Sequence, residues 1–198
     1  MSRYTGSDPY LDPATGVLRN RLGIRDATDL EETEAALAAT RSYELWEAPL
    51  KGNFDLAHLQ SIHRHLFCDL YEWAGELRCI DISKGGSMFA HHGYLESAAA
   101  PIFEQLARER NLAGLGPDRF SERAGHYLGE LNALHPFREG NGRAQREFIG
   151  LVAQANGYSI AWENVSRPRM LEAAIESFRG DSSKLVQIIR KNLDKLGN

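Results

Sequence analysis

Apolar residues recur at three- and four-residue steps through most of the sequence, the spacing that places them on one face of a helix. The clearest case is residues 55–70, whose apolar positions are Leu56, Leu59, Ile62, Leu66, Phe67 and Leu70. Similar patterns occupy residues 95–106 and 117–134, the stretch that ends at Asn156, and two segments at about 168–178 and 182–196. Residues 26–47 are rich in alanine and can be capped by Asp26 or Thr28. The chain is therefore predicted to be mainly helical.

One region departs from the helical pattern. Residues 77–82 and 88–90 are two short strand-like runs, and the turn between them contains Gly85-Gly86. This arrangement is typical of a β-hairpin. No second hairpin is expected, so the predicted fold is a compact helical bundle with one small hairpin.

Length and charge limit the classes of protein. The 198 residues favour a single structural unit, with an N-terminal extension and first helix at 1–48 and the main domain at 49–198. A net charge of -4 disfavours a general nucleic-acid-binding protein, which gains affinity by neutralising phosphates.

No apolar run is long enough to span a bilayer and no signal peptide is evident, so a cytoplasmic protein without membrane insertion is expected. Cys68 and Cys79 lack CxxC spacing and are expected to be buried thiols in a reducing compartment.

The most unusual segment connects two predicted helices, where residues 135–143 read HPFREGNGR. Gly140 and Gly142 can adopt backbone angles barred to other residues, which allows successive N–H groups to turn inward as an anion-binding nest. The nest opens a helix whose N-terminus carries partial positive charge, and Arg143 and Arg146 share one face of that helix. The segment is therefore predicted to hold several phosphates in a row.

Two further residues of this segment indicate chemistry. Glu139 is its only carboxylate and is the expected protein ligand of a Mg²⁺ ion that accompanies the phosphates. His135, with a reference pKa of about 6.5, can accept a proton from an incoming hydroxyl at neutral pH. Phe137 is expected to anchor the loop in the core. A plain connector with a capping glycine and surface arginines would account for a lone GxG, but not for the whole string.

The string resembles the HxFx(D/E)GNGRxxR signature of Fic-domain proteins at every fixed position. Those positions are His135, Phe137, Glu139, Gly140, Asn141, Gly142, Arg143 and Arg146. The similarity extends to the segment YEWAGELR at residues 71–78 and to the hairpin, and it covers about residues 50–190. The resemblance implies a Fic-type helical bundle, ATP and Mg²⁺ as cofactors, and transfer of AMP to a Ser, Thr or Tyr hydroxyl of a target protein.

The resemblance also implies a role for each motif residue. His135 is the general base, Glu139 binds Mg²⁺, and Asn141 contacts the α-phosphate, while the two arginines hold the β- and γ-phosphates. The hairpin resembles the family's flap, which binds an extended target segment by strand addition. The flap residues expected to contact the target are Arg78, Ile80, Ile82 and Phe89, and those expected to border the nucleotide are Lys84 and Gly85.

Fic proteins are often restrained by a helix with the pattern (S/T)xxxE(G/N), whose glutamate pairs with the second motif arginine, here Arg146. Residues 159–164, from Ser159 to Asn164, fit these letters but follow the helix stop at Asn156-Gly157. Residues 28–33 are helical but end in Thr33. The chain therefore resembles the toxin of a toxin–antitoxin pair, restrained by a separate small helical antitoxin. The same resemblance suggests a type II topoisomerase subunit, such as gyrase B, as the target.

Two other functions stay open. One is a Fic-fold phosphotransferase of another specificity, although the Gly142-Arg143 pair disfavours the kinase-like branch, which typically has a lysine after the asparagine. The other is a nucleotide-binding module without turnover. The remaining histidines are expected to have no special role. His91 and His92 are expected to be surface residues, because neighbours in sequence point to different faces; His58, His63, His65 and His126 are expected to be ordinary helix residues.

Overall fold

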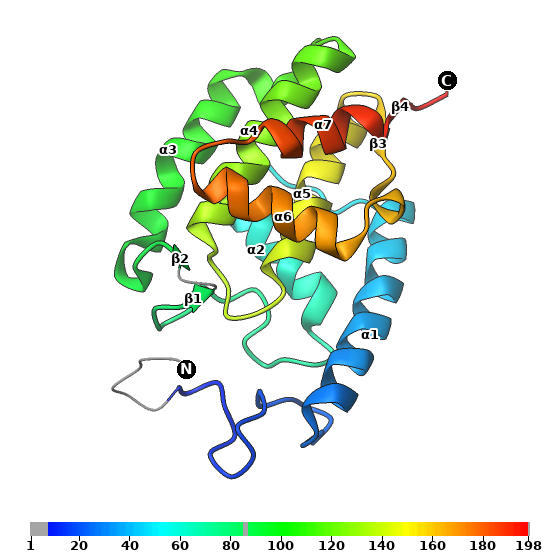
Figure 1. Cartoon of the computed structure of the whole chain (residues 1–198). Coiled ribbons are helices and arrows are strands. Elements are labelled where there is room, and N and C mark those ends of the chain that lie inside the picture. Colours follow the sequence, from blue (N-terminus) through cyan, green and yellow to red (C-terminus); the bar gives the residue numbers. More distant parts are fainter. Residues whose placement is uncertain (1–7, 85–86, 198) are drawn as a thin grey trace.

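A computed structural model describes residues 8–84 and 87–197 of the chain (Figure 1). The described residues are mainly helical, as predicted. The α-helices are α1 (Ala27–Glu47), α2 (Leu56–Phe67), α3 (Leu95–Arg108), α4 (Pro117–Leu134), α5 (Asn141–Ala155), α6 (Arg167–Phe178) and α7 (Ser183–Lys191). Three short 3-10 helices lie between them: η1 (His92–Tyr94), η2 (Arg110–Leu112) and η3 (Trp162–Asn164).

Helix α4 lies at the centre and packs against α3, α5, α6 and α7. Helix α7 approaches α4 closely at Gly125, where an added Cβ atom would lie 2.6 Å from Cγ2 of Val186. Helix α2 packs on α5, and α1 covers α2 from the outside (Figure 1). This arrangement brings the start of α5 and the end of α4 to the same end of the bundle as α2. The 135–143 loop therefore lies where three helices meet.

The first two helices begin at the caps that their sequences provide. The carboxylate of Asp26 accepts hydrogen bonds from the backbone N–H groups of Thr28 and Asp29. The carboxylate of Asp55 accepts one from the N–H of His58. Each bond satisfies a donor that has no partner within the helix. The expected start of α1 is confirmed.

The hairpin exists, but its strands are shorter and nearer to the tip than predicted. They are β1 (Ser83–Lys84) and β2 (Ser87–Met88), paired antiparallel with Ser83 opposite Met88. Residues 77–82 do not form a strand because their backbone is bound elsewhere: the N–H of Arg78 donates to the carbonyl of Pro136 at 2.9 Å. The first run therefore attaches the hairpin to the motif loop instead of extending it.

A second small sheet was not expected from the sequence. Strand β3 (Tyr158–Ile160) pairs antiparallel with β4 (Leu193–Lys195), with Ile160 opposite Leu193. The final helix consequently ends at Lys191 instead of near Leu196. The pairing joins segments more than thirty residues apart, so no local turn signals it. Within residues 159–164, Ser159 lies in a strand and Trp162–Asn164 form a single 3-10 turn, which confirms that this stretch is not an α-helix.

The N-terminal segment wraps around the end of the bundle that contains the motif loop. Its backbone folds back on itself through a bridge between Leu11 and Leu18, and the N–H of Arg21 donates to the carbonyl of Leu70 at 2.9 Å. The hydroxyl of Tyr10 accepts a hydrogen bond from the N–H of Cys79 at 3.0 Å. Burial raises the pKa of Tyr10 to about 12.

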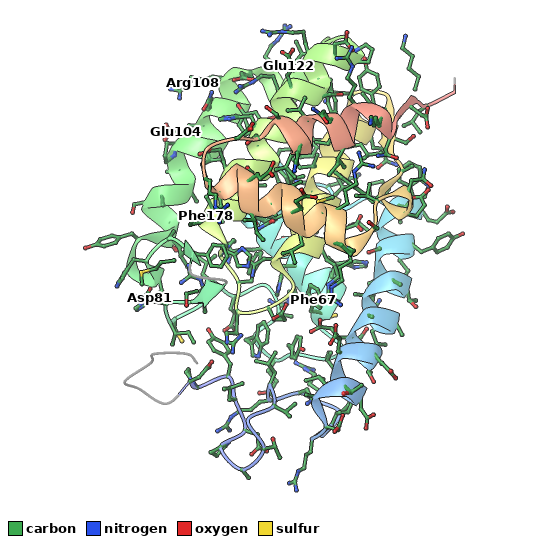
Figure 2. The ribbon with its side chains drawn as sticks, viewed as in Figure 1. Phe67, Asp81, Glu104, Arg108, Glu122 and Phe178 are labelled. Carbon is green, nitrogen blue, oxygen red and sulfur yellow. The ribbon has the colours of Figure 1, made fainter. Side chains whose placement is uncertain are left out.

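The surface differs from expectation in one respect. The two cysteines are free thiols, but Cys68 is half-buried and Cys79 is exposed, so the expectation of buried thiols was wrong. Charged side chains such as Glu104, Arg108 and Glu122 project from α3 and α4, away from the motif loop (Figure 2). No helix in the described ranges has both the length and the apolar character needed to cross a membrane.

Candidate active site

His135 is placed at the very end of α4 in a left-handed conformation, with φ 46° and ψ 62°. Such angles are uncommon for a residue other than glycine and are frequent at functional sites. Its backbone N–H still donates to the carbonyl of Leu131 at 3.0 Å. Its Nδ1 lies 3.2 Å from the carbonyl oxygen of Asn132, which can only accept, so a neutral ring carries its proton on Nδ1. The lone pair of the neutral imidazole is therefore on Nε2.

The side chain of Arg78 joins the backbone carbonyl of this histidine to the two ends of the hairpin. Its Nε donates to the carbonyl of His135 at 2.9 Å, its Nη1 to that of Ile80 at 2.7 Å, and its Nη2 to that of Ala90. Arg78 is 2% exposed. We expected it to contact the target from the flap, but the structure buries it between the loop and the hairpin, so its observed contacts are internal.

The other predicted flap residues are placed differently. Ile80 and Ile82 are half-buried near the base of the hairpin, and the N–H of Phe89 donates to the carbonyl of Ile82. The ring of Phe89 stacks on His135 with a centroid distance of 3.8 Å. Lys84 ends β1, and Gly85 lies outside the described residues. The hairpin is thus directly connected to the proposed base.

The body of the motif loop is built around the side chain of Asn141. Its Oδ1 accepts from the N–H of Phe137 at 2.9 Å, and its Nδ2 donates to the carbonyl of Phe137 at 2.8 Å. Phe137 is completely buried, as predicted, and Asn141 is 3% exposed. The Asn141 side chain therefore closes the loop on itself. The group of this residue that can bind an anion is its backbone N–H, at the first turn of α5.

Gly140 turns the chain from the loop into α5 with φ 78°. A side chain at this position would collide with the ring of Phe67 in α2. The loop can therefore approach α2 closely only with glycine here. The N–H of Gly140 donates to Oε1 of the exposed Glu139 at 3.0 Å. An exposed carboxylate beside a helix N-terminus is a hard oxygen ligand of the kind that Mg²⁺ prefers, so Glu139 fits the expected metal.

His63 of α2 is a site residue that the sequence did not reveal. Its Nδ1 accepts from the N–H of Gly75 at 2.9 Å, so Nε2 donates to the carbonyl of Glu139 at 2.9 Å. Its ring stacks on Phe137 with a centroid distance of 3.8 Å. Burial lowers its pKa to about 4, so the ring is neutral at pH 7. This histidine positions the motif loop, and we had expected an ordinary helix residue.

The two motif arginines have different surroundings. Arg143 donates from Nη2 to Oε1 of Glu34 in α1, and its guanidinium carbon lies 4.8 Å from the centroid of the Phe67 ring. Arg146 is half-buried, with Nη1 close to Gly142. Burial lowers the pKa of Arg146, although an arginine keeps its charge at neutral pH. Within the described ranges, no ion pair joins Arg146 to a carboxylate.

An ion pair between Arg138 and Asp8 connects the motif loop to the N-terminal segment. Nη2 of Arg138 lies 2.8 Å from Oδ2 of Asp8, and both side chains are largely buried. The partners are separated by 130 residues, so sequence spacing gave no sign of the pair. The loop is therefore held from three sides, by α2, by the hairpin and by the N-terminal segment.

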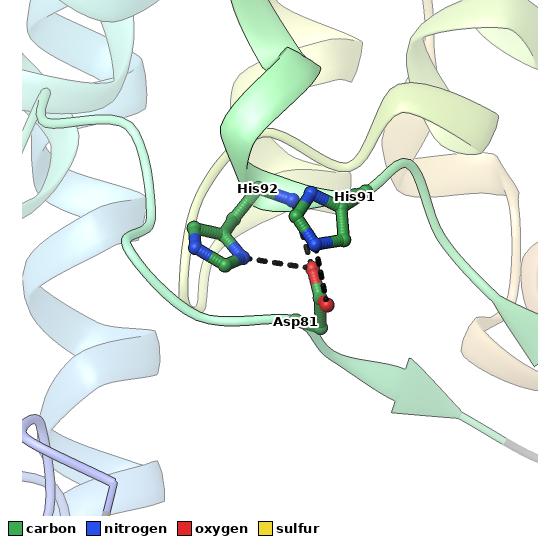
Figure 3. Close-up of side chains that lie close together, drawn as sticks. All are labelled: Asp81, His91 and His92. Carbon is green, nitrogen blue, oxygen red and sulfur yellow. Dashed lines mark hydrogen bonds and ion pairs between the residues drawn. The ribbon is translucent and has the colours of Figure 1, made fainter.

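Asp81, His91 and His92 meet at the base of the hairpin (Figure 3). Asp81 accepts from the backbone N–H and from Nδ1 of His92, at 2.8 and 3.0 Å, and Nε2 of His91 lies 3.3 Å from its other oxygen. Nδ1 of His91 accepts from the N–H of Gly93, which assigns the proton of a neutral ring to Nε2. A metal would need the lone pair of that nitrogen. The group is therefore a clamp that joins the two ends of the hairpin. His91 is exposed and His92 half-buried, but their rings stack with a centroid distance of 4.6 Å, so the expectation that they point to different faces was wrong.

Proteins similar to this chain identify its family. The model of the Fic/DOC family matches residues 53–153. The protein adenylyltransferase VbhT of Bartonella schoenbuchensis is 54% identical over 98% of this chain, which spans 41% of the length of VbhT. The probable protein adenylyltransferase Fic of Salmonella typhimurium is 38% identical, over 96% of this chain and 94% of that protein.

Solved structures share the fold. The BepC protein of Bartonella tribocorum, with bound AMPPNP, has a TM-score of 0.93 at 28% identity and covers 98% of this chain and 100% of that one. The Fic domain of a Bep effector protein of Bartonella quintana, with bound ADP, has a TM-score of 0.90 at 28% identity, over 94% and 95% of the two chains. The helical bundle, the loop and its sequence, and these similarities show that the chain belongs to the Fic/DOC family.

Proposed function

We propose that this chain is a protein adenylyltransferase that transfers AMP from ATP to a hydroxyl side chain of a target protein. The observation that carries the proposal is the position of His135, whose Nε2 has the lone pair of the neutral ring. His135 is the first residue of the loop that ends at the N-terminus of α5, the helix that bears both motif arginines. The names of the relatives and the nucleotides bound by the structural neighbours support the same activity.

Each motif residue has a role in the proposed transfer of AMP. Nε2 of His135 accepts the proton of the target hydroxyl, the hydroxyl oxygen bonds to the α-phosphorus, and pyrophosphate leaves. The N–H groups at the start of α5 and the guanidinium groups of Arg143 and Arg146 bind the phosphates. Glu139 would hold Mg²⁺, which neutralises phosphate charge when bound. Lys84 and Gly85 remain candidates for contacts to the nucleotide.

ATP labelled at either the α- or the γ-phosphate tests the reaction type. The purified chain and a protein lysate should give protein-bound label from α-labelled ATP only. Protein-bound γ-label would instead identify a phosphotransferase, and absence of both would identify a binding module. Mass spectrometry of the labelled protein would then identify the target and the modified residue.

The metal assignment has its own test. Replacement of Glu139 by Ala should weaken Mg²⁺-dependent ATP binding, and EDTA should weaken ATP binding to the wild type far more than to this variant. An equal effect of the chelator on both proteins would mean that the metal binds elsewhere.

We also propose that the hairpin binds an extended target segment through its backbone. Replacement of Ile80 by Val should be tolerated, whereas Ile80→Pro should impair modification because proline removes a donor that an added strand can use. Unchanged modification by a folded Ile80→Pro variant would exclude strand addition at residue 80, which precedes β1.

Finally, we propose that the chain is a toxin of the cytoplasm, restrained by a separate small helical antitoxin, with a type II topoisomerase subunit such as gyrase B as the first target to assay. The absence of a carboxylate paired with Arg146 among the described residues supports restraint from outside. A partner glutamate could form a bidentate pair with this guanidinium and displace the γ-phosphate. Adding such a partner should suppress transfer, and replacing its glutamate by glycine should restore it.

A further inference from the structure

Helix α1 buries a carboxylate within its apolar stripe. Leu30, Glu34 and Ala38 recur at four-residue steps and are all buried, and Glu34 is 7% exposed. Glu32, two residues earlier on the same helix, is exposed. A buried carboxylate is unfavourable unless it is paired and hydrogen-bonded. The partners of Glu34 therefore explain its position.

Both oxygens of Glu34 accept a hydrogen bond. Oε2 accepts from the hydroxyl of Tyr71, and Oε1 accepts from Nη2 of Arg143, the first arginine of the motif. Tyr71 is 1% exposed. Burial and the bond to Glu34 raise the pKa of Tyr71, so the hydroxyl keeps its proton and remains a donor. The carboxylate is thus fixed on one side by Tyr71 and carries Arg143 on the other.

The guanidinium of Arg143 is held from two directions. Glu34 binds one nitrogen, and the Phe67 ring lies under the guanidinium carbon at 4.8 Å from its centroid. In the part of the chain that the structure describes, Nη2 is the one guanidinium nitrogen of Arg143 with an acceptor. An arginine side chain is otherwise flexible, and a planar fork that is already oriented loses less entropy when it binds a phosphate.

We propose that Glu34 is a positioning residue for the triphosphate: it orients Arg143 at the start of α5 so that the remaining N–H groups bind a phosphate beyond the α-position. This inference rests on the proposed function. The carboxylate removes one positive charge from the site, but the helix N-terminus and Arg146 keep the site positive. The orientation of Arg143 therefore outweighs the loss of one positive charge in phosphate binding. Helix α1, which carries Glu34, is thus part of the nucleotide site.

The test compares nucleotides with and without the outer phosphates. Dissociation constants for ATP and AMP are measured with Mg²⁺ by calorimetry for the wild type, Glu34→Gln and the matched control Glu32→Gln. In Glu34→Gln the dissociation constant for ATP should rise about three- to thirtyfold, within the range of couplings between contacting residues. The constant for AMP should stay within about twofold in all three proteins, and Glu32→Gln should bind ATP as the wild type does.

A second pair of variants separates positioning from stability. Glu34→Met together with Tyr71→Phe replaces the buried carboxylate and hydroxyl by apolar groups of similar size and leaves Arg143, whose side chain is 26% exposed, in contact with water. The double variant should have the same melting temperature as Tyr71→Phe alone. Its KM for ATP should rise more than that of Glu34→Gln, and its kcat should stay nearly unchanged. If Glu34→Met does not fold, the Glu34→Gln data decide.

Three results would overturn the inference. They are ATP binding that is unchanged in Glu34→Gln, ATP binding that becomes tighter because the carboxylate competes with phosphate, and equal weakening of ATP and AMP, which indicates a general structural effect. Arg143→Ala distinguishes the cause. If Arg143→Ala weakens ATP binding while Glu34→Gln does not, only this inference fails; if neither weakens it, the phosphate role of Arg143 in the proposed function fails as well.

Discussion

The ring of Phe89, just after strand β2, lies parallel to the ring of His135, with a centroid distance of 3.8 Å and an interplanar angle of 13°. Phe178 of α6 meets Phe89 edge-on at 5.6 Å. The proposed base is thus oriented by α4, through the carbonyl of Asn132, and by the hairpin, through Phe89. A displacement of the hairpin would move a ring that supports the base.

Replacement of Phe89 by Ala should lower kcat for transfer about ten- to a hundredfold, because a small misplacement of a catalytic group costs rates of this order. Binding of ATP should change little, since the ring of Phe89 stacks on the proposed base. Phe178→Leu is the matched control, because Phe178 meets Phe89 edge-on, and its effect should be smaller. A folded Phe89→Ala variant with wild-type kcat would show that the stacking is incidental.

Replacement of His63 by Leu should destabilise the chain by about 2 to 5 kcal/mol, because the buried N–H of Gly75 and the carbonyl of Glu139 both lose their partner. Thermal unfolding of the variant measures this loss. His126→Leu is a suitable control, because Nε2 of His126 is buried without a hydrogen-bond partner in the described structure. An equal fall of the melting temperature in both variants would contradict the positioning role of His63.

Neither internal glutamate should act as a brake. Glu163 is exposed in η3, and Glu32 is exposed on α1. Across the described ranges, neither forms an ion pair with Arg146. Glu163→Gly and Glu32→Gly should therefore leave the rate of transfer by the isolated chain at its starting level. Strong activation by either change would show that the restraint is built into the chain.

Sequence patterns predicted the parts of the molecule that depend on local order. Helix α1 begins after Asp26 as its cap indicates, and Phe137 is buried as an apolar residue in a polar loop should be. The motif also placed His135 near the start of α5, because only six residues, 135–140, lie between the two helices. Periodicity and short motifs report interactions between residues close in sequence.

Long-range partners could not be predicted in this way. Glu34 looked like one of several acidic residues near the start of α1, and its pairing with Arg143 requires the packing of α1 on α2. His63 occupies a helical position that any residue could fill until Gly75 and the motif loop approach it. In both cases the side chain's role is decided by segments that the fold brings together.

In the proposed AMP-transfer reaction His135 moves the proton, while the rest of the site binds the nucleotide. A base of this kind contributes about 10² to 10⁴ to the rate. His135→Ala should retain the fold, because the backbone contacts of residue 135 do not use its side chain.

The most direct measurement is single-turnover transfer of label from α-labelled ATP to the target protein, by the wild type and His135→Ala in parallel, with ATP affinity determined on the same samples. We expect the variant to lose transfer by about 10² to 10⁴ while its dissociation constant for ATP stays close to that of the wild type. Transfer at the wild-type rate by His135→Ala would show that this side chain is not the base.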